Sequence, residues 1–126
     1  MKISLKKIGH PFQLEATNDT GNSIRFDASE SIGGTDLGIR PMQALAASLA
    51  ACSSIDVLLI LQKQKYTIVD YDVEIEAKRT DETPAVFESI HLIFKLKGAP
   101  IDKCERAVAL SVEKYCSVSR MLEKSV

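Results

Sequence analysis

A long apolar stretch in the middle of the chain places the strongest constraint on the fold. Between residues 44 and 61 the only interruptions are three serines, Cys52 and Asp56. Pro41 precedes the stretch and is a favourable first-turn residue, so the sequence predicts a helix over residues 41–65, about 37 Å long. A helix that is apolar on every side is buried on every side.

The need to bury this helix on every side predicts the oligomeric state. One sheet of a chain this small covers one side only, and a second subunit is the simplest cover for the rest. We therefore expect an obligate homodimer with an interface of more than about 2,000 Å². No membrane span is expected, because Asp56 lies near the centre of the stretch with serines around it.

Alternation of apolar and polar residues predicts antiparallel strands on both sides of the helix. Three strands precede the helix, at 3–8, 12–16 and 24–28, and two follow it, at 71–78 and 90–97. Asp102 is expected to cap a second helix, and a short third helix is expected over residues 117–124. The predicted order is βββ-α-ββ-α-α, which is an α+β fold in a single domain of residues 1–126.

Composition and charge exclude several classes of protein. The chain carries 16 Lys and Arg residues against 17 Asp and Glu residues, so no nucleic acid partner is expected. Met1–Ile8 contains no apolar core of a signal peptide. Three cysteines in 126 residues do not predict a disulfide scaffold. These features favour the cytoplasm, where paired cysteines are more often catalytic than structural.

No metal or cofactor motif is present in the sequence. There is no CxxC or HExxH, and the only two histidines are far apart. Gly33–Gly38 is glycine-rich but lacks the lysine of a phosphate-binding loop, and a flexible loop is the better interpretation. We therefore expect no metal and no cofactor.

Two cysteines are candidate functional residues. Cys52 lies within the predicted long helix, and Cys116 lies where the second helix gives way to the third. A thiol at a helix junction can face the N-terminus of the next helix, whose dipole lowers the thiol pKa. Each cysteine is also explained as a buried core thiol, because free cysteine is among the most buried residue types. Cys104 falls on an apolar stripe and is expected to be a core residue.

The segments around these cysteines resemble a known family. The run GIRPMQAL at 38–45, followed by AACSSIDV at 50–57, is similar to the first cysteine motif of the osmotically inducible protein C and organic hydroperoxide resistance (OsmC/Ohr) superfamily. EKYCSV at 113–118 resembles the second motif, and the intervening hairpin also resembles a subgroup of the family. The resemblance covers almost the whole chain. It implies an intertwined homodimer in which two long central helices lie back to back, wrapped by antiparallel sheets.

The resemblance also implies an activity. Characterised members reduce organic hydroperoxides, with the first cysteine, here Cys52, as the peroxidatic thiolate. The second cysteine, here Cys116, condenses with the resulting sulfenic acid to form a disulfide. An external dithiol reductant then restores the pair. In this family an arginine lowers the pKa of the peroxidatic thiol, and a glutamate near the start of the central helix holds that arginine.

The sequence departs from the family pattern at the glutamate. Gln43 occupies that position, and a neutral amide holds a guanidinium less firmly than a carboxylate does. Arg25 and Arg40 are the candidates for the arginine, although each is also explained as a solvated surface residue. Asp56 lies one turn beyond Cys52 and would raise the thiol pKa if it were ionised and close, but we expect a hydrogen-bonded polar group there.

Two functions remain open from the sequence. The first is a thiol peroxidase for organic hydroperoxides, with weak activity because of Gln43. The second is a non-enzymatic dimeric module that binds a small apolar ligand or senses redox state. The two cysteines favour the first, whereas Gln43 and the unplaced arginine favour the second. Family members usually continue into a final strand after the segment that ends here at Val126, which leaves a missing or a shorter terminus open.

Overall fold

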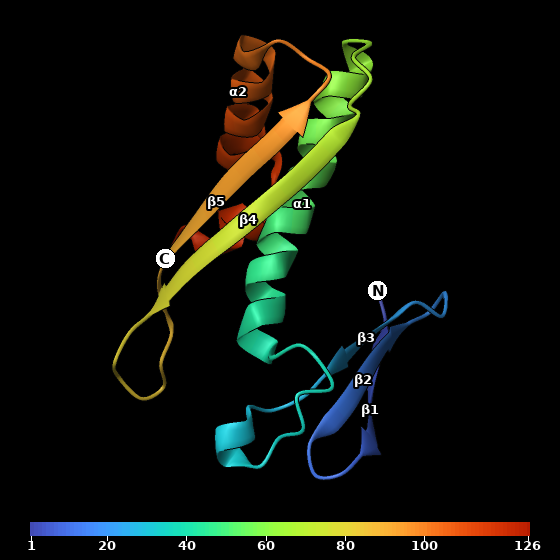
Figure 1. Cartoon of the computed structure of the whole chain (residues 1–126), viewed down its shortest axis with the longest axis vertical. Coiled ribbons are helices and arrows are strands. Elements are labelled where there is room, and N and C mark those ends of the chain that lie inside the picture. The colour runs from blue at the N-terminus through green and yellow to red at the C-terminus, as the bar shows by residue number, and fades with distance from the viewer. The chain divides into compact units, whose positions relative to one another are not determined.

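The computed structural model describes residues 1–126 and has the α+β architecture that the sequence predicts (Figure 1). The strands and α-helices follow one another as βββ-α-ββ-α-α, so the predicted order is confirmed. The chain forms two compact units, which consist of residues 1–45 and 46–126. The first contains three strands and a loop, and the second contains a hairpin and the helices that pack on it.

The first unit is built on an antiparallel sheet of order β1-β2-β3, with β1 at Ile3–Gly9, β2 at Gln13–Asn18 and β3 at Ser23–Phe26. Asn18 shapes the turn between β2 and β3. Its side-chain oxygen accepts hydrogen bonds from the backbone N–H groups of Thr20 and Asn22, at 3.1 and 2.9 Å. Gly21 adopts a φ of 90°, which favours glycine and explains its place in this turn.

The loop after β3 is organised by the carboxylate of Asp27, which is only 2% exposed. This carboxylate accepts hydrogen bonds from the Thr35 hydroxyl at 2.6 Å and from the backbone N–H groups of Leu37 and Ala28 at 3.2 and 2.7 Å. The Thr35 hydroxyl, helped by these backbone donors, lowers the pKa of Asp27 below its ordinary value although burial opposes the shift. The loop also holds a single 3₁₀ turn, η1 at Glu30–Ile32.

The long helix α1 spans Pro41–Lys63 and ends two residues before the predicted end. Lys65 takes a left-handed conformation with φ 66°, and its N–H bonds the Gln62 carbonyl at 2.9 Å. The next N–H bonds the Leu61 carbonyl at 3.0 Å, which completes a Schellman motif. By length and mean hydropathy (2.1) this helix could cross a membrane, but core helices of soluble proteins share both properties.

The second unit places two helices on one face of an antiparallel hairpin (Figure 1). Its elements are β4 at Asp70–Arg79, β5 at Phe87–Lys97 and α2 at Ile101–Leu110, packed together with α1. The centre of the core consists of Val57 and Leu61 from α1 with Cys104 and Ala107 from α2. Cys104 is therefore a core thiol, as predicted.

The end of α2 departs from the simple helix that was predicted. The helix begins at Ile101 directly after Pro100, so the expectation that Asp102 caps it is wrong, and Asp102 lies in its first turn. A single π-helical turn, η2 at Ser111–Tyr115, follows α2. After it, Cys116 has an extended backbone, and the last helix, α3, spans Ser117–Leu122. Such π turns occur mostly as single insertions and frequently at functional sites.

Candidate functional site

The fold brings Cys52 and Cys116 together although they are far apart in the sequence. Cys52 lies in the middle of α1, and Cys116 lies in the short link between η2 and α3. The two sulfur atoms and a carboxylate oxygen of Asp56 all lie within 4.8 Å of one another. All three residues belong to the unit of residues 46–126. A packed core of helices therefore positions the pair, rather than a mobile loop.

Cys116 is buried and serves as the N-cap of α3. Only 2% of the residue is exposed, and its sulfur accepts a hydrogen bond from the Ser119 N–H at 3.4 Å. The Ser53 hydroxyl donates a second hydrogen bond to the same sulfur, also at 3.4 Å. A cysteine at a helix junction was expected to face a helix N-terminus, and Cys116 does so by capping that terminus itself.

Cys52 is the more accessible thiol of the pair. The backbone N–H of Val118, in the first turn of α3, lowers the pKa of the Cys52 thiol. The Cys116 side chain and the Ser117 N–H lower it further, while burial and the charge of Asp56 raise it. The net shift is downward, which favours the thiolate, the form that acts as a nucleophile. The backbone N–H groups at the start of α3 thus stabilise a negative charge on the Cys52 sulfur, which lies on α1.

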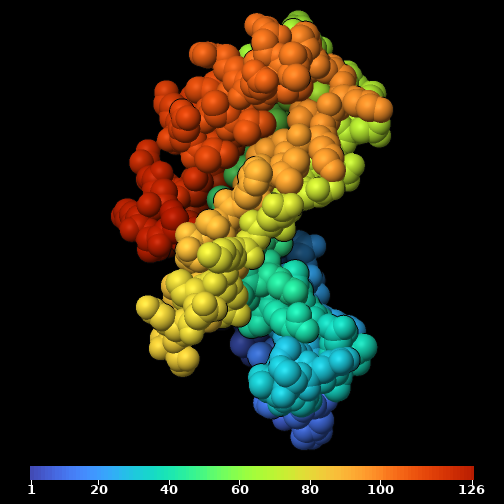
Figure 2. Space-filling model, turned by 60° about the vertical axis from the view of Figure 1, so that its left-hand side comes forward, coloured from blue at the N-terminus to red at the C-terminus, as the bar shows by residue number.

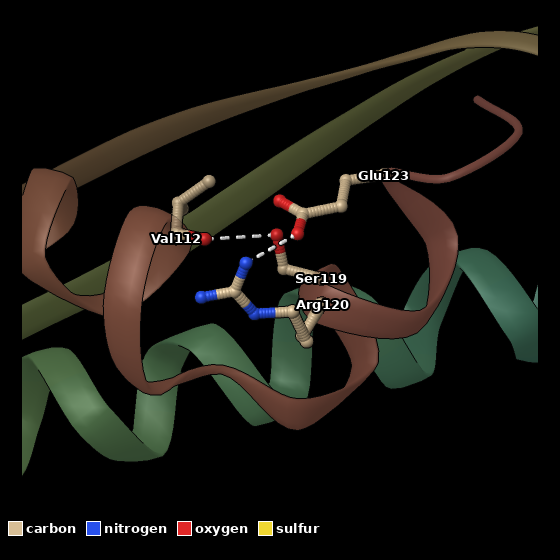
Figure 3. A network of polar contacts seen from close by, with 4 residues as sticks. All are labelled: Val112, Ser119, Arg120 and Glu123. Atoms are coloured by element: carbon tan, nitrogen blue, oxygen red, sulfur yellow. Dashed lines mark hydrogen bonds and ion pairs between the residues drawn. The ribbon is translucent and has the colours of Figure 1, made fainter.

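Hydrogen bonds from buried serine hydroxyls stabilise this arrangement. Ser111, which is fully buried at the start of η2, donates to the Ser53 carbonyl at 2.9 Å and lies 3.3 Å from the Asp56 carboxylate. The hydroxyl of Ser119 bonds the Val112 carbonyl at 2.9 Å and so ties α3 to η2 (Figure 3). Asp56 is therefore a hydrogen-bonded polar group, as expected, and it is close to the thiols as well.

α3 carries an ion pair on its exposed side. The guanidinium of Arg120 contacts the Glu123 carboxylate at 2.7 Å, three residues farther along the chain (Figure 3). Exposed pairs of this kind contribute little to stability, typically about 0.2–1 kcal/mol. The buried Ser119 bond and the Cys116 cap, rather than this pair, fix the start of α3.

The other predicted site residues lie in the unit of residues 1–45. Arg25 forms an exposed ion pair with Glu15 at 3.3 Å, in keeping with a solvated surface arginine. The side-chain oxygen of Gln43 accepts a hydrogen bond from the backbone N–H of Arg40 at 3.0 Å, and so caps the start of α1. The Nε of Arg40 is buried without a hydrogen-bond partner. A role of these three residues at Cys52 stays a prediction.

The serines of the site were not among the predicted functional residues. Ser53 and Ser111 are both fully buried, and their hydroxyls contact the Cys116 sulfur and the Asp56 carboxylate. Ser53 is adjacent to Cys52 in the sequence, and this adjacency was an available signal. Nothing in the sequence singled out Ser111, because it joins the site only through the packing of η2 on α1.

Comparison with known proteins identifies the family. The family model described as OsmC-like protein matches residues 34–126. The protein YhfA of Escherichia coli K12 is 38% identical over 109 residues, which cover 85% of this chain and 78% of YhfA. A crystal structure of a protein from Aquifex aeolicus VF5 has a TM-score of 0.84 at 28% identity, covering 99% of this chain and 88% of that one.

A more distant structure shares the fold. The organic hydroperoxide resistance protein OhrB of Bacillus subtilis has a TM-score of 0.61 at 22% identity, covering 100% of this chain and 93% of OhrB. The family model covers about three quarters of the chain, and YhfA is a close relative over most of its length. The resemblance seen in the two cysteine segments is thereby confirmed. The chain belongs to the OsmC-like protein family.

Proposed function

We propose that this protein is a thiol peroxidase that reduces organic hydroperoxides through Cys52 and Cys116. The observation that carries the proposal is the proximity of the two sulfurs, within 4.8 Å, in a site where α3 lowers the pKa of Cys52. Membership of a family that includes organic hydroperoxide resistance proteins supports the same chemistry.

The proposed reaction has three steps. The Cys52 thiolate attacks the terminal oxygen of the hydroperoxide, the O–O bond breaks, and an alkoxide leaves that takes up a proton to become the alcohol. The Cys116 sulfur then attacks the sulfenic acid on Cys52, forming a disulfide and releasing water. An external dithiol reduces this disulfide by thiol–disulfide exchange. Cys104 takes no part, because it is held in the core.

Two features of the chain limit the proposed activity. The charge of Asp56 acts against the thiolate of Cys52, so the site gains less from α3 than it would with a neutral neighbour. Gln43 supplies no charge with which to hold an activating arginine. We therefore expect turnover below that of members with the family glutamate.

We also propose that the protein acts as a homodimer in the cytoplasm. On α1, the apolar side chains of Ile55, Leu58 and Leu59 are exposed in the single chain. The β1–β3 sheet has no apolar core of its own, because Ile3, Leu5 and other apolar residues on its strands are exposed. Two such surfaces on one chain are typical of subunits that bury them against each other.

The activity can be tested by oxidation followed by mass spectrometry. Reduced protein is treated with one equivalent of cumene hydroperoxide, alkylated and digested, and the expected product links Cys52 to Cys116 while Cys104 is alkylated. Cys116→Ser should stop at the sulfenic acid on Cys52, which dimedone traps. A dominant adduct on Cys104, or no reaction of Cys52 with hydroperoxide, would contradict the proposal.

One observation supports the alternative of an apolar ligand module. The surface is hollowed between β5 on one side and α2, η2 and α3 on the other, and α1 forms the floor of the hollow (Figure 2). The cavity measures about 420 Å³, and its apolar lining consists mainly of Leu49, Ile90, Leu92, Phe94, Val108, Val112 and Leu122. Sites for small molecules span roughly 300–1,000 Å³. Binding of an apolar fluorescent probe without any reaction of Cys52 with hydroperoxide would favour this function over the peroxidase.

A further inference from the structure

Asp56 places a third group that can bind a metal beside the two thiols. One of its carboxylate oxygens and the sulfurs of Cys52 and Cys116 lie within 4.8 Å of one another. In a tetrahedral zinc site, with Zn–S about 2.3 Å and Zn–O about 2.0–2.2 Å, ligand atoms lie roughly 3.5–3.8 Å apart. Side-chain rotations that move these atoms by about 1 Å or less would therefore close the three ligands around one cation.

The position of Asp56 is unfavourable for a thiolate alone. A carboxylate beside a nucleophilic thiol opposes the negative charge that α3 favours, and adds to the repulsion as soon as the thiol ionises. A divalent cation between the three groups reverses this balance, because each negative charge then faces a positive one. The acid that handicaps the peroxidase is thus suited to a cation site.

The surroundings orient these groups as ligands. Ser111 lies 3.3 Å from the Asp56 carboxylate, and the Ser53 hydroxyl bonds the Cys116 sulfur at 3.4 Å. Hydrogen bonds to ligand side chains fix ligand orientation in metal sites, and their loss typically lowers affinity about 10- to 100-fold. Cys116 and both serines are buried, so the site excludes water on that side.

We propose that the reduced protein binds a thiophilic divalent cation, with Zn²⁺ as the probe, through the sulfurs of Cys52 and Cys116 and the carboxylate of Asp56. Binding releases the thiol protons, and a fourth position stays open to water. The disulfide has no thiolate to offer, so the metal-bound and oxidised states exclude each other. The cation site requires the two reduced thiols and Asp56 but no peroxidase activity, and it therefore goes beyond the peroxidase proposal.

The test is a metal titration of the full chain, reduced and free of oxygen. Zn²⁺ binding is measured by competition with a chromophoric chelator, and Co²⁺ binding by its thiolate charge-transfer and tetrahedral d–d bands. We expect one ion per chain, and no such binding to the Cys52–Cys116 disulfide form. Asp56→Asn should weaken Zn²⁺ binding by at least about tenfold, because it replaces an anionic carboxylate ligand with a neutral amide. Asp81→Asn, an exposed turn carboxylate, is the matched control and should bind like the wild type.

Specific results would overturn the site. If Asp56→Asn, shown to be folded by its thermal unfolding curve, binds Zn²⁺ as tightly as the wild type, Asp56 is no ligand. Equal affinity of the reduced and disulfide forms would place the ion elsewhere. Rapid oxidation by cumene hydroperoxide that saturating Zn²⁺ does not slow would also refute it. Each of these results leaves the metal-free reaction of Cys52 with hydroperoxide, and so the peroxidase proposal, untouched.

Discussion

Truncation of Ile55 to alanine tests whether the exposed face of α1 is a subunit interface. Full burial of an isoleucine side chain stabilises by about 1.5–3 kcal/mol. Ile55 is 67% exposed in the single chain, so an interface that covers it gains about 1–2 kcal/mol per subunit. A twofold dimer buries the residue twice, and the total is about 2–4 kcal/mol.

Alanine removes most of this stabilisation, so the dimer dissociation constant should rise by about 10- to 500-fold. The folded monomer should not suffer, because alanine has the higher helix propensity. Sedimentation velocity over a concentration series measures the constant directly. For a very tight dimer, the same change appears in the dependence of the unfolding midpoint on protein concentration.

Ile101→Ala is the matched control for this experiment. Ile101 is 77% exposed but lies on α2, so its truncation should leave the dissociation constant within about twofold of the wild type. If Ile55→Ala dissociates no more readily than the wild type, the face of α1 around Ile55 is not an interface. If the wild type itself is monomeric at micromolar concentration, no second subunit covers the apolar helix.

The remaining predictions concern activity and stability. Gln43→Glu should speed the reaction with cumene hydroperoxide by about tenfold, which corresponds to about 1.4 kcal/mol, and lower the pKa of Cys52. A glutamate at position 43 can still accept the hydrogen bond from the Arg40 N–H, so the substitution should not disturb the start of α1. An unchanged rate in stopped-flow experiments and an unchanged pKa of the Cys52 thiol would therefore show that no arginine partner exists. Asp27→Asn should lower the urea concentration at the unfolding midpoint at neutral pH. It should also reduce the fall of that midpoint as the pH is lowered into the acid range. The folded pKa of Asp27 lies below the ordinary value of about 3.9, so its contribution is present above that pH and disappears as the pH falls through the folded pKa. If the urea midpoints of the variant and the wild type fall equally as the pH is lowered, this prediction is wrong. Leu61→Ala should cost about 2–5 kcal/mol of unfolding free energy, because the side chain is fully buried, and a loss below about 1 kcal/mol would mean that the core collapses around the gap.

The sequence predicted the elements well because hydrophobic periodicity is local. Strands β4 and β5 alternate cleanly, and the apolar run marks α1 to within two residues. The errors lie at the ends of the elements. Strand β5 begins at Phe87, three residues before the predicted start, and the helix ends depend on their capping residues. Lys65 in a left-handed turn and Pro100 before α2 override the expected boundaries, and neither effect follows from periodicity.

The chemistry of the site was harder to predict than the fold. Family resemblance pointed to Cys52 and Cys116, but their surroundings depend on contacts across some 60 residues of sequence. Search patterns for metal sites are linear, and a cysteine and aspartate one turn apart with a distant cysteine match none of them. The π turn that ends in Tyr115 also has no sequence signature, yet the chain reaches Cys116 through it.

The Cys116 sulfur has consequences for the C-terminal segment of the chain. As the cap of α3 it is the acceptor for the Ser119 N–H, and a thiolate is a stronger acceptor than a thiol or a disulfide sulfur. Every change in the chemical state of this atom therefore changes how firmly residues 117–122 are held. Amide hydrogen exchange of that short segment should act as a gauge of the bonding state of the thiol, fast when the sulfur is engaged elsewhere and slow when it is free to cap.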